Sequence, residues 1–319
     1  MKRQRGAALL AAMLTVTLVA TFAAAAMWQQ WRNVEIESAD RQRVQSTWIL
    51  TGALDWARLI LREDRGTVDH LAEPWAVPLQ EARLSTFLAA DQSNNAMTET
   101  SDAEQVFLSG DITDAQSRLN LTGLVEAAVV NDKRLKTFRR LFDLLALPQA
   151  ELTTMQENLR FASDISIDNR NAGRASLPPQ RVEQLVWLGL APATVAALEP
   201  YVTILPQATP VNLNTAPAEV IYAAIGSISL ADAQRIVAER ARQHFSDPEA
   251  VKPLLPVGAE FDRSTLSVAS NYFEVRGRLR IDDIVIEERS LVLRLGGEVR
   301  TLQRERGATE TFVTAAPPR

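Results

Sequence analysis

One apolar run dominates the N-terminal part of the chain, and it extends from Ala7 to Gln30 without a charged residue. About 20 apolar residues at about 1.5 Å each are enough to cross a hydrocarbon core, so the run predicts a membrane-spanning helix. Lys2, Arg3 and Arg5 precede it, and the positive-inside tendency places them in the cytoplasm and the rest of the chain across the membrane. The residues expected to anchor the helix in lipid are Leu9, Leu10, Leu14, Val16, Leu18, Val19 and Phe22.

The apolar pattern continues beyond this span at helical spacing. Apolar doublets recur at 49–50, 53–54, 56–57 and 60–61, which predicts a helix with one buried side. From Trp28 to Arg62 the chain holds no proline and a single glycine, so we expect one rod of about 80 Å. Its first half would lie in lipid and its second half against a globular domain.

Two interpretations of the apolar segment differ in whether it is retained. The segment also fits a secretory signal, because it has a basic start, an apolar stretch and small residues at Ala24–Ala26. Cleavage of such a signal would release a protein that begins near Met27. The uninterrupted helical pattern beyond that point favours retention. A second junction lies between Gly6 and Ala7, where a glycine separates basic residues from the apolar helix.

The pattern then changes twice. Residues 106–121 predict short strands with a turn, and residues 122 to about 242 are helical, whereas alternation returns at 272–279 and 285–295. These elements predict an α+β fold in which a long N-terminal helix packs on an antiparallel β-sheet and a large all-α domain is inserted between sheet strands. One buried face of the helical stretch is expected to consist of Leu135, Phe138, Leu141, Phe142 and Leu145.

Composition restricts the function classes. A net charge of −5 over 319 residues, with an isoelectric point near 5.3, disfavours a nucleic-acid surface. The chain has no cysteine, so disulfides cannot contribute to its fold. His70 and His244 are its only histidines, which leaves little material for a histidine-based metal or catalytic site.

Paired acids are the remaining candidates for catalysis. Asp282 and Asp283 are expected to mark a hairpin turn, and Glu287 and Glu288 to lie on the exposed face of the following strand. Solvated surface charge is therefore the favoured interpretation of both pairs, and we predict no enzyme activity.

The tryptophans of the N-terminal helix divide into two pairs. Trp28 and Trp31 lie where the span leaves the lipid, which is typical of an interfacial aromatic belt. Trp48 and Trp56 are expected to be core residues between the helix and the sheet.

Three stretches together resemble one family. In order they are RGAALLAAMLTVTLVATFAAAAMWQQW from Arg5, DAQSRLNL at 114–121 and VNLNTAPAEV at 211–220. This order resembles general secretion pathway protein K, the K-type minor pseudopilins of type II secretion, and the resemblance covers Gly6 to about Leu295. It implies a non-enzymatic, structural component at the tip of a short periplasmic pseudopilus, which helps to initiate and cap its assembly for the export of folded proteins.

The resemblance also implies processing, location and partners. Prepilin peptidase would cut between Gly6 and Ala7 and methylate Ala7, so the single span stays in the inner membrane of a Gram-negative bacterium, with the bulk of the chain in the periplasm. The partners would be the minor pseudopilins of types I and J and, through them, the major pseudopilin.

Six segments follow from the pattern and the resemblance. Residues 1–6 would be a cytoplasmic leader and 7–30 the transmembrane half of the helix. The pilin-like domain would comprise 31–121 and 267–300, on either side of an inserted helical domain at 122–266. The remaining segment, 301–319, is expected to be a flexible tail.

Ala11 supports the tip position. Pilin-like subunits usually carry a glutamate at the fifth mature position, where it pairs with the N-terminal ammonium of a neighbouring subunit; here that position is Ala11. An unpaired carboxylate in lipid costs a few kcal/mol or more, and a subunit with no neighbour above it has no ammonium to offer as a partner. Without the family context, Ala11 is one more alanine in a span.

A helix-hairpin-helix module at 211–242 carries the alternative function, a membrane-anchored DNA-binding protein of an uptake system. Such modules hold phosphates with a glycine-rich turn and helix N-termini. The turn here has only Gly226, and Glu219, Asp232 and Glu239 lie nearby, which weakens a phosphate site. A packing module in which Asn212, Asn214 and Thr215 brace a turn is favoured.

One feature departs from the family pattern. K-type pseudopilins often carry an acidic loop with calcium-binding character. The corresponding stretch here, 161–179, is short, so we predict no metal and no cofactor, although calcium stays possible. Its candidate oxygen donors are Asp164, Asp168 and Asn169.

Overall fold

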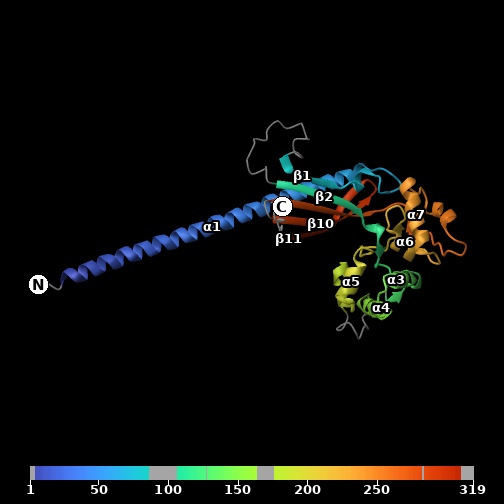
Figure 1. Cartoon of the computed structure of the whole chain (residues 1–319), viewed down its shortest axis with the longest axis horizontal. Coiled ribbons are helices and arrows are strands. Elements are labelled where there is room, and N and C mark those ends of the chain that lie inside the picture. Colours follow the sequence, from blue (N-terminus) through green and yellow to red (C-terminus); the bar gives the residue numbers. More distant parts are fainter. Residues whose placement is uncertain (1–3, 86–105, 127, 164–175, 282–283, 310–319) are drawn as a thin grey trace, which may run out of the picture. The chain divides into compact units, whose positions relative to one another are not determined.

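The computed structural model describes residues 4–85, 106–126, 128–163, 176–281 and 284–309. The chain divides into two units, residues 1–53 and residues 54–319. Helix α1 (Gln4–Glu63) has 60 residues, which corresponds to a length of about 90 Å. Figure 1 shows it as one uninterrupted helix. The long N-terminal helix predicted from the apolar pattern is therefore confirmed.

A five-stranded antiparallel sheet forms the centre of the second unit. Its spatial order is β1-β2-β9-β10-β11. The register places Ile112 of β2 opposite Val275 of β9. The hairpin positions 282–283 lie outside the described residues, but Ile281 and Ile284 on either side of them pair directly. The strands are β1 (Leu79–Arg83), β2 (Val106–Asp114), β9 (Tyr272–Ile281), β10 (Ile284–Leu295) and β11 (Glu298–Thr309).

The last turns of α1 and one face of this sheet share a hydrophobic core. Leu54, Ala57 and Leu61 are buried at helical spacing, and each fully buried leucine stabilises the fold by about 1.5–3 kcal/mol. Trp75, from the 3₁₀ helix η1 (Pro74–Ala76), packs edge-on against Phe273 with ring centroids 5.2 Å apart. The other members of this core are Ile112, Val275, Val292 and Val299.

The predicted flexible tail at 301–319 is wrong for its first part. Strand β11 pairs with β10 along its length, as far as Thr309 opposite Val285. The turn between the two strands is Gly296–Gly297, whose positive φ angles of 59° and 83° suit a tight hairpin that only glycine adopts easily. Residues 310–319 lie outside the described residues.

The segment between β2 and β9 is mainly helical, and Figure 1 shows its helices grouped at one end of the sheet. The predicted insertion, 122–266, lies within this interval of 115–271, so the α+β fold with a helical insertion is confirmed. The helices are η3 (Ala115–Ser117), α3 (Asp132–Leu144), α4 (Gln149–Ser163), η5 (Val182–Leu188), α5 (Pro192–Leu198), α6 (Ala218–Ala224), α7 (Leu230–Arg242) and η6 (Pro248–Leu254).

The described residues of the interval 115–271 also form three two-stranded pairs, so this interval is not purely helical. Two of them, β3·β6 and β7·β8, are parallel and join residues far apart in the chain. The third is the local antiparallel pair β4·β5. Their bounds are β3 (Leu119–Asn120), β4 (Val125–Glu126), β5 (Val129–Val130), β6 (Val202–Thr203), β7 (Val211–Asn212) and β8 (Leu266–Ser267).

The predicted buried face of α3 is confirmed. Leu135, Phe138, Leu141 and Phe142 are buried, and Leu145 packs against the same core from the end of the helix. The helix starts where it does because the side chain of Asn131 accepts the backbone N–H of Arg134.

Candidate functional site

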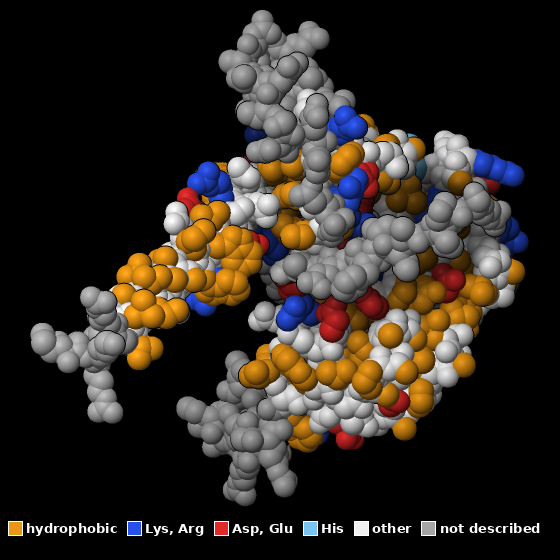
Figure 2. All heavy atoms as spheres, turned by 60° about the vertical axis from the view of Figure 1, so that its left-hand side comes forward, with side chains coloured by type: hydrophobic (Ala, Val, Ile, Leu, Met, Phe, Trp, Pro, Cys, Tyr) orange, Lys and Arg blue, Asp and Glu red, His pale blue; other side chains and the backbone are white. Residues whose placement is uncertain are grey.

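The N-terminal part of α1 presents an apolar surface. By length and composition, α1 from Ala8 onward is able to cross a membrane, with a mean hydropathy of 2.2 in its most apolar window. On the face that Figure 2 shows, hydrophobic side chains cover most of the outer part of this rod. The hydroxyls of Thr15, Thr17 and Thr21 donate to carbonyls one turn back, so they need no water. The predicted anchor residues Leu9, Leu10, Leu14, Val16, Leu18, Val19 and Phe22 are all exposed.

The three predicted assembly positions lie in the first turns of this helix. Gly6 and Ala7 are within α1, and Ala11 is exposed on it. Cleavage after Gly6, methylation of Ala7 and the role of Ala11 at a tip concern processing and assembly, and they stay predictions.

A buried polar cluster joins the sheet to the insertion, and we call it the joint cluster: Asp69, Asp114, Asn212, Thr215 and Ser270. Oδ2 of Asp114, at the end of β2, accepts the hydroxyls of Thr215 and Ser270, both at 2.6 Å. The same atom accepts Nδ2 of Asn212 at 3.0 Å, and Asn212 also donates to the carbonyl of Asp69. The DAQSRLNL and VNLNTAPAEV motifs therefore meet at one carboxylate.

The expectation that Asn212, Asn214 and Thr215 brace a turn is confirmed, and the bracing is more extensive than the sequence suggested. Oδ1 of Asn212 accepts the backbone N–H of Asn214 at 2.9 Å. The side chain of Asn214 makes two hydrogen bonds with the backbone of Phe245, which holds the segment after α7 in place. The sequence showed the braced turn but not Asp114, Asp69 and Ser270 as its partners.

Burial raises the pKa of Asp114 above its usual value, because the charged carboxylate would lose its contact with water. The hydrogen bonds from Ser270, Thr215, Gln116 N–H and Asn212 oppose that shift. Burial likewise raises the pKa of Asp69, against the opposing effects of the Ser270 N–H and Arg294. The joint cluster thus holds two carboxyl groups in an environment that disfavours charge.

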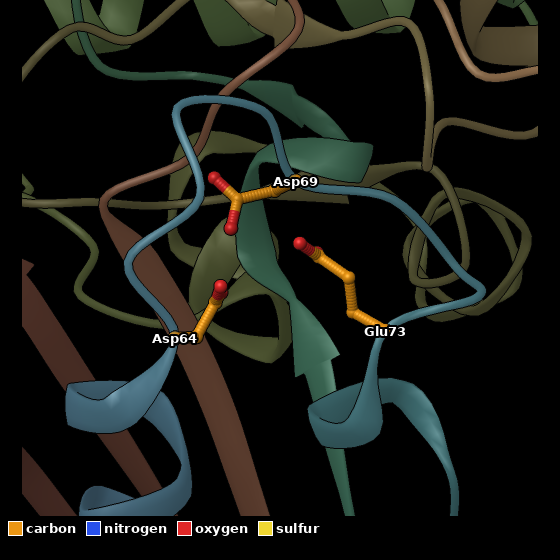
Figure 3. A group of neighbouring side chains, drawn as sticks. All are labelled: Asp64, Asp69 and Glu73. Atoms are coloured by element: carbon orange, nitrogen blue, oxygen red, sulfur yellow. The ribbon is translucent and has the colours of Figure 1, made fainter.

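Asp69 also belongs to an acidic group at the end of α1. Figure 3 shows the side chains of Asp64, Asp69 and Glu73 directed toward one another from the end of α1 and the loop after it. Arg294 of β10 donates to Asp64 at 2.6 Å and also to Asp69. Glu73 accepts the N–H of His70 and Nε1 of Trp75 at 2.9 and 2.7 Å.

Two members of this acidic group, Asp64 and Asp69, form ion pairs with Arg294. Burial acts to lower the pKa of Arg294, but Asp69 and Asp64 raise it above its usual value. The guanidinium ties the end of α1 to β10, and through Asp69 it reaches the joint cluster. The candidate oxygen donors Asp164, Asp168 and Asn169, for which no metal is predicted, lie outside the described residues.

The helix hairpin formed by α6 and α7 uses its own polar groups internally. The backbone N–H and carbonyl of Gly226 both pair with Glu260, at 3.3 and 2.8 Å, and an added Cβ would lie 2.5 Å from Oε2 of Glu260. Ser229 caps α7 and exchanges hydrogen bonds with Asp232. A phosphate at this turn would meet two carboxylates instead of free N–H donors, which counts against the DNA-binding alternative.

Arg240 of α7 reinforces this packing role. It donates to the carbonyls of Leu213 and Ala216 at 2.6 and 2.5 Å, and burial lowers the pKa of its guanidinium to about 10. The cation thus holds the VNLNTAPAEV segment against α7.

The expectation that Glu287 and Glu288 are solvated surface charge is wrong. The side chain of Glu288 is 4% exposed and accepts from Arg304 and Arg306 of β11 at 2.5 and 2.6 Å. Glu287 is 16% exposed and accepts from Arg278 and Arg289. Both glutamates are held in ion pairs within the sheet, and Asp282 and Asp283 lie outside the described residues.

The two histidines lie together although they are far apart in the sequence. The rings of His70 and His244 stack with centroids 3.9 Å apart and an interplanar angle of 11°. The contact brings the loop after α1 against the segment after α7, close to the joint cluster.

The tryptophan predictions have two outcomes. Trp28 and Trp31 are exposed with ring centroids 5.4 Å apart, as expected of residues that meet a lipid interface. Trp48 and Trp56 are 73% and 49% exposed, so the prediction that they are core residues is wrong. Successive residues of a helix lie about 100° apart around its axis, so the buried side of α1 contains Leu54 and Ala57, and Trp56 lies outside it.

Comparisons with known proteins agree on one family. Two family models, both described as Type II secretion system (T2SS), protein K, match residues 117–207 and 211–269, and the second interval contains Asn212 and Thr215. Type II secretion system protein K of Pseudomonas aeruginosa is 28% identical over 94% of this chain and 89% of its own. The protein of the same name from Pectobacterium carotovorum is 25% identical over 97% of this chain and 98% of its own.

A solved structure shows the same fold. A chain in the crystal structure of the GspK–GspI–GspJ complex from the type 2 secretion system of enterotoxigenic Escherichia coli matches with a TM-score of 0.61. The sequence identity is 20%, and the match covers 84% of this chain and 98% of that one.

Proposed function

This chain belongs to the type II secretion system protein K family, and on that premise we propose that it is a minor pseudopilin at the tip of a periplasmic pseudopilus. It acts as a structural component, without enzyme activity, that helps to initiate and cap the filament for export of folded proteins across the outer membrane. Its span is retained in the inner membrane after cleavage between Gly6 and Ala7.

Ala11 carries this proposal. It lies on the exposed apolar part of α1, where a carboxylate without a partner ammonium would cost a few kcal/mol or more in lipid. In a subunit with a neighbour above it, a glutamate at that position would be stabilised by pairing with the neighbour's N-terminal ammonium. An apolar residue suits a subunit that ends the filament.

The joint cluster, which lies near the C-terminal end of α1, also supports a position at the tip of the pseudopilus. Arg294 links the joint cluster to Asp64, the residue just after α1. In a filament of parallel helices this end points away from the membrane. The insertion is therefore fixed near the C-terminal end of α1, which no further subunit would cover in a tip subunit.

The proposed partners are other minor pseudopilins, of types I and J, and through them the major pseudopilin. The GspK chain of similar fold was crystallised with GspI and GspJ, which motivates this choice. Prepilin peptidase and inner-membrane lipid are the remaining proposed partners, and nucleic acid is not among them.

Two measurements test this proposal. N-terminal sequencing of the mature protein should find a methylated Ala7, whereas a start near Met27 would show that the span is removed.

The Ala11→Glu variant should reduce secretion and co-assembly with the other minor pseudopilins, and Ala11→Leu is the matched control of similar polarity to the native residue. Normal tip assembly by Ala11→Glu would contradict the capping role.

A further inference from the structure

Arg134, in the first turn of α3, is a partly buried cation whose guanidinium has no carboxylate within 4.0 Å among the described residues. It donates instead to the carbonyls of Asn120, Thr122 and Thr209, at 3.3–3.4 Å. These bonds are long, since N–H donors usually lie about 2.9 Å from oxygen. Arg240, which also binds two carbonyls, holds them at 2.6 and 2.5 Å. Arg134 therefore keeps most of its capacity to donate.

The guanidinium of Arg134 is held in place by a close approach of the backbone. Gly123 has a φ of 87°, and an added Cβ there would lie 3.2 Å from Nε of Arg134 and 2.7 Å from Cβ of Ala208. Only glycine leaves this room. Burial lowers the pKa of Arg134, and the negative charge of Glu126 opposes that shift without forming an ion pair. The fold thus fixes a cation at a cost that no carboxylate within hydrogen-bond distance offsets.

A cavity lies beside this cation. Its volume is about 30 Å³, which is room for about two or three water-sized groups. Asn120 of the DAQSRLNL motif and Val211 of the VNLNTAPAEV motif both contribute to its wall. A carboxylate group fits such a volume, whereas a phosphate ester or a sugar is too large for it.

The cavity wall also offers a hydroxyl donor. The hydroxyl oxygen of Thr209 accepts Nδ2 of Asn120 at 3.1 Å, and it donates to no acceptor among the described residues. The hydroxyl of Thr265, by contrast, already donates to the carbonyl of Asp262 at 2.9 Å. Arg134 and Thr209 therefore present donors, and a carboxylate is the group that accepts from both and neutralises the cation.

We propose that the cavity at Arg134 binds a carboxylate group of another protein, either an acidic side chain or a C-terminal carboxylate. The guanidinium and the Thr209 hydroxyl donate to its oxygens. The cavity encloses only the carboxylate, so a free acid binds weakly, in about the millimolar range or above. A protein adds contacts around the opening and binds more tightly. This binding site lies in the insertion and goes beyond the proposed function.

Acetate is the probe for the first test, with the purified full chain in detergent at constant ionic strength. The NMR signal of the Arg134 Nε–H group, assigned from its absence in Arg134→Lys, should shift saturably with acetate. It should not shift with acetamide, which has a similar shape and no charge. Arg139 is exposed on the same helix and is the matched control, so its signal should shift little. Equal, unsaturated shifts at both arginines would overturn the proposal.

Thr137→Glu tests the site while Arg134 stays in place. Thr137 lines the cavity and lies three positions after Arg134 on α3, close enough for their side chains to meet. The introduced carboxylate should occupy the ligand's place, so it should raise the urea midpoint of unfolding above that of Thr137→Gln and abolish the acetate shift. An arginine that only braces the backbone predicts neither effect. Equal midpoints, or an acetate shift that persists in Thr137→Glu, would overturn the proposal.

A carbodiimide identifies the protein that supplies the carboxylate. It joins a carboxylate and an adjacent amine as an amide, and the oxygen that leaves the carboxylate ends in the urea formed from the reagent. Arg134→Lys places the amine in the cavity, and Arg139→Lys places it on the exposed side of the same helix. In membranes from cells with the complete secretion system, mass spectrometry should find an amide between position 134 and another protein, in clear excess over position 139. The peptide identified distinguishes an acidic side chain from a C-terminus.

Other products overturn the proposal. They are an amide to Glu126 of the same chain as the main product, equal yields at positions 134 and 139, or no adduct at 134 with another protein. The proposed function is decided separately. If deletion of the whole chain leaves secretion intact, that function fails, whereas the acetate and Thr137→Glu results come from the purified chain and are unaffected.

Discussion

Asp114 of the joint cluster and Glu288 of the β10–β11 hairpin are both buried carboxyl groups, and their surroundings stabilise them by different means. Asp114 is 3% exposed and receives only neutral donors, from a serine, a threonine, an asparagine and a backbone N–H. Glu288 is about equally buried but lies between two arginines that are 34% and 31% exposed. The stability of buried Asp114 depends on every one of its neutral donors being in place. The arginines that pair with Glu288 are partly exposed, so water still contacts that ion pair.

This difference reflects what each region connects. The bonds of Asp114 in the joint cluster reach residues 98 to 156 positions away, so their geometry fixes the insertion relative to the sheet. The Glu288 pairs join neighbouring strands across 16 and 18 positions, where backbone pairing already fixes the register. We therefore expect substitutions in the joint cluster to be the more damaging.

The largest effect is expected for Asp114→Ala. The change removes the acceptor of the Ser270 hydroxyl and the acceptor that the Thr215 hydroxyl meets at 2.6 Å, while Asn212 keeps its bond to the carbonyl of Asp69. An unsatisfied buried donor costs about 1–3 kcal/mol. The free energy of unfolding should fall by about 3 kcal/mol or more, as followed by the fluorescence of the full chain in detergent with urea. Thr113→Ala, at the exposed neighbouring position, is the control and should change little.

A smaller effect is expected for Glu288→Gln. The amide keeps the shape of the side chain and loses the charge, while Arg304 and Arg306 can turn toward water. The cost should be about 1–2 kcal/mol in the same urea titration. A loss as large as that of Asp114→Ala would remove the distinction between the two regions.

Thr215→Val should cost about 1 kcal/mol. The variant is similar in shape and removes one of the hydrogen bonds to Asp114 without removing the acceptor. Combining it with Ser270→Ala in a double-mutant cycle measures whether the donors act together. Strictly additive losses would show that the cluster is a set of independent bonds.

The smallest expected effect is a pH dependence that Asp114 alone confers. Its pKa is raised in the folded state, so the folded protein holds this proton to higher pH than the unfolded chain does. The stability contributed by this group is therefore present below about pH 3.9 and is lost as the pH rises through the folded-state pKa. The difference in unfolding free energy between the wild type and Asp114→Asn should shrink or reverse over that interval, and a constant difference would contradict the raised pKa.

Periodicity predicted the elements that have one buried side. The strands at 272–279 and 285–295 and the buried face of α3 were found because apolar residues repeat there at intervals of two or of three to four. Strand β11 was missed because the run from Gln303 to Arg306 is polar and breaks the alternation of apolar and polar residues. Its pairing depends on the Gly296–Gly297 turn and on Glu288 of the preceding strand.

The same limit applies to the candidate site. The motif residues Asn212, Asn214 and Thr215 were recognised as a braced turn, since asparagine and threonine side chains commonly bond to nearby backbone groups. Asp114 lay within another motif, and nothing in its neighbours indicated that it would be buried. Glu288 was predicted to lie on the surface because a charged residue in a strand is usually solvated.

The sequence by itself determined the apolar helix, the α+β order of elements and the membership suggested by three ordered motifs, because each depends on residues close together in the chain. Only the tertiary structure decided which polar groups are buried and with what partners. The bonds of Asp114 to Asn212, Thr215 and Ser270 cross 98 to 156 positions. Burial of a carboxylate depends on packing from such distant segments, and no local pattern of hydrophobic and polar residues records it.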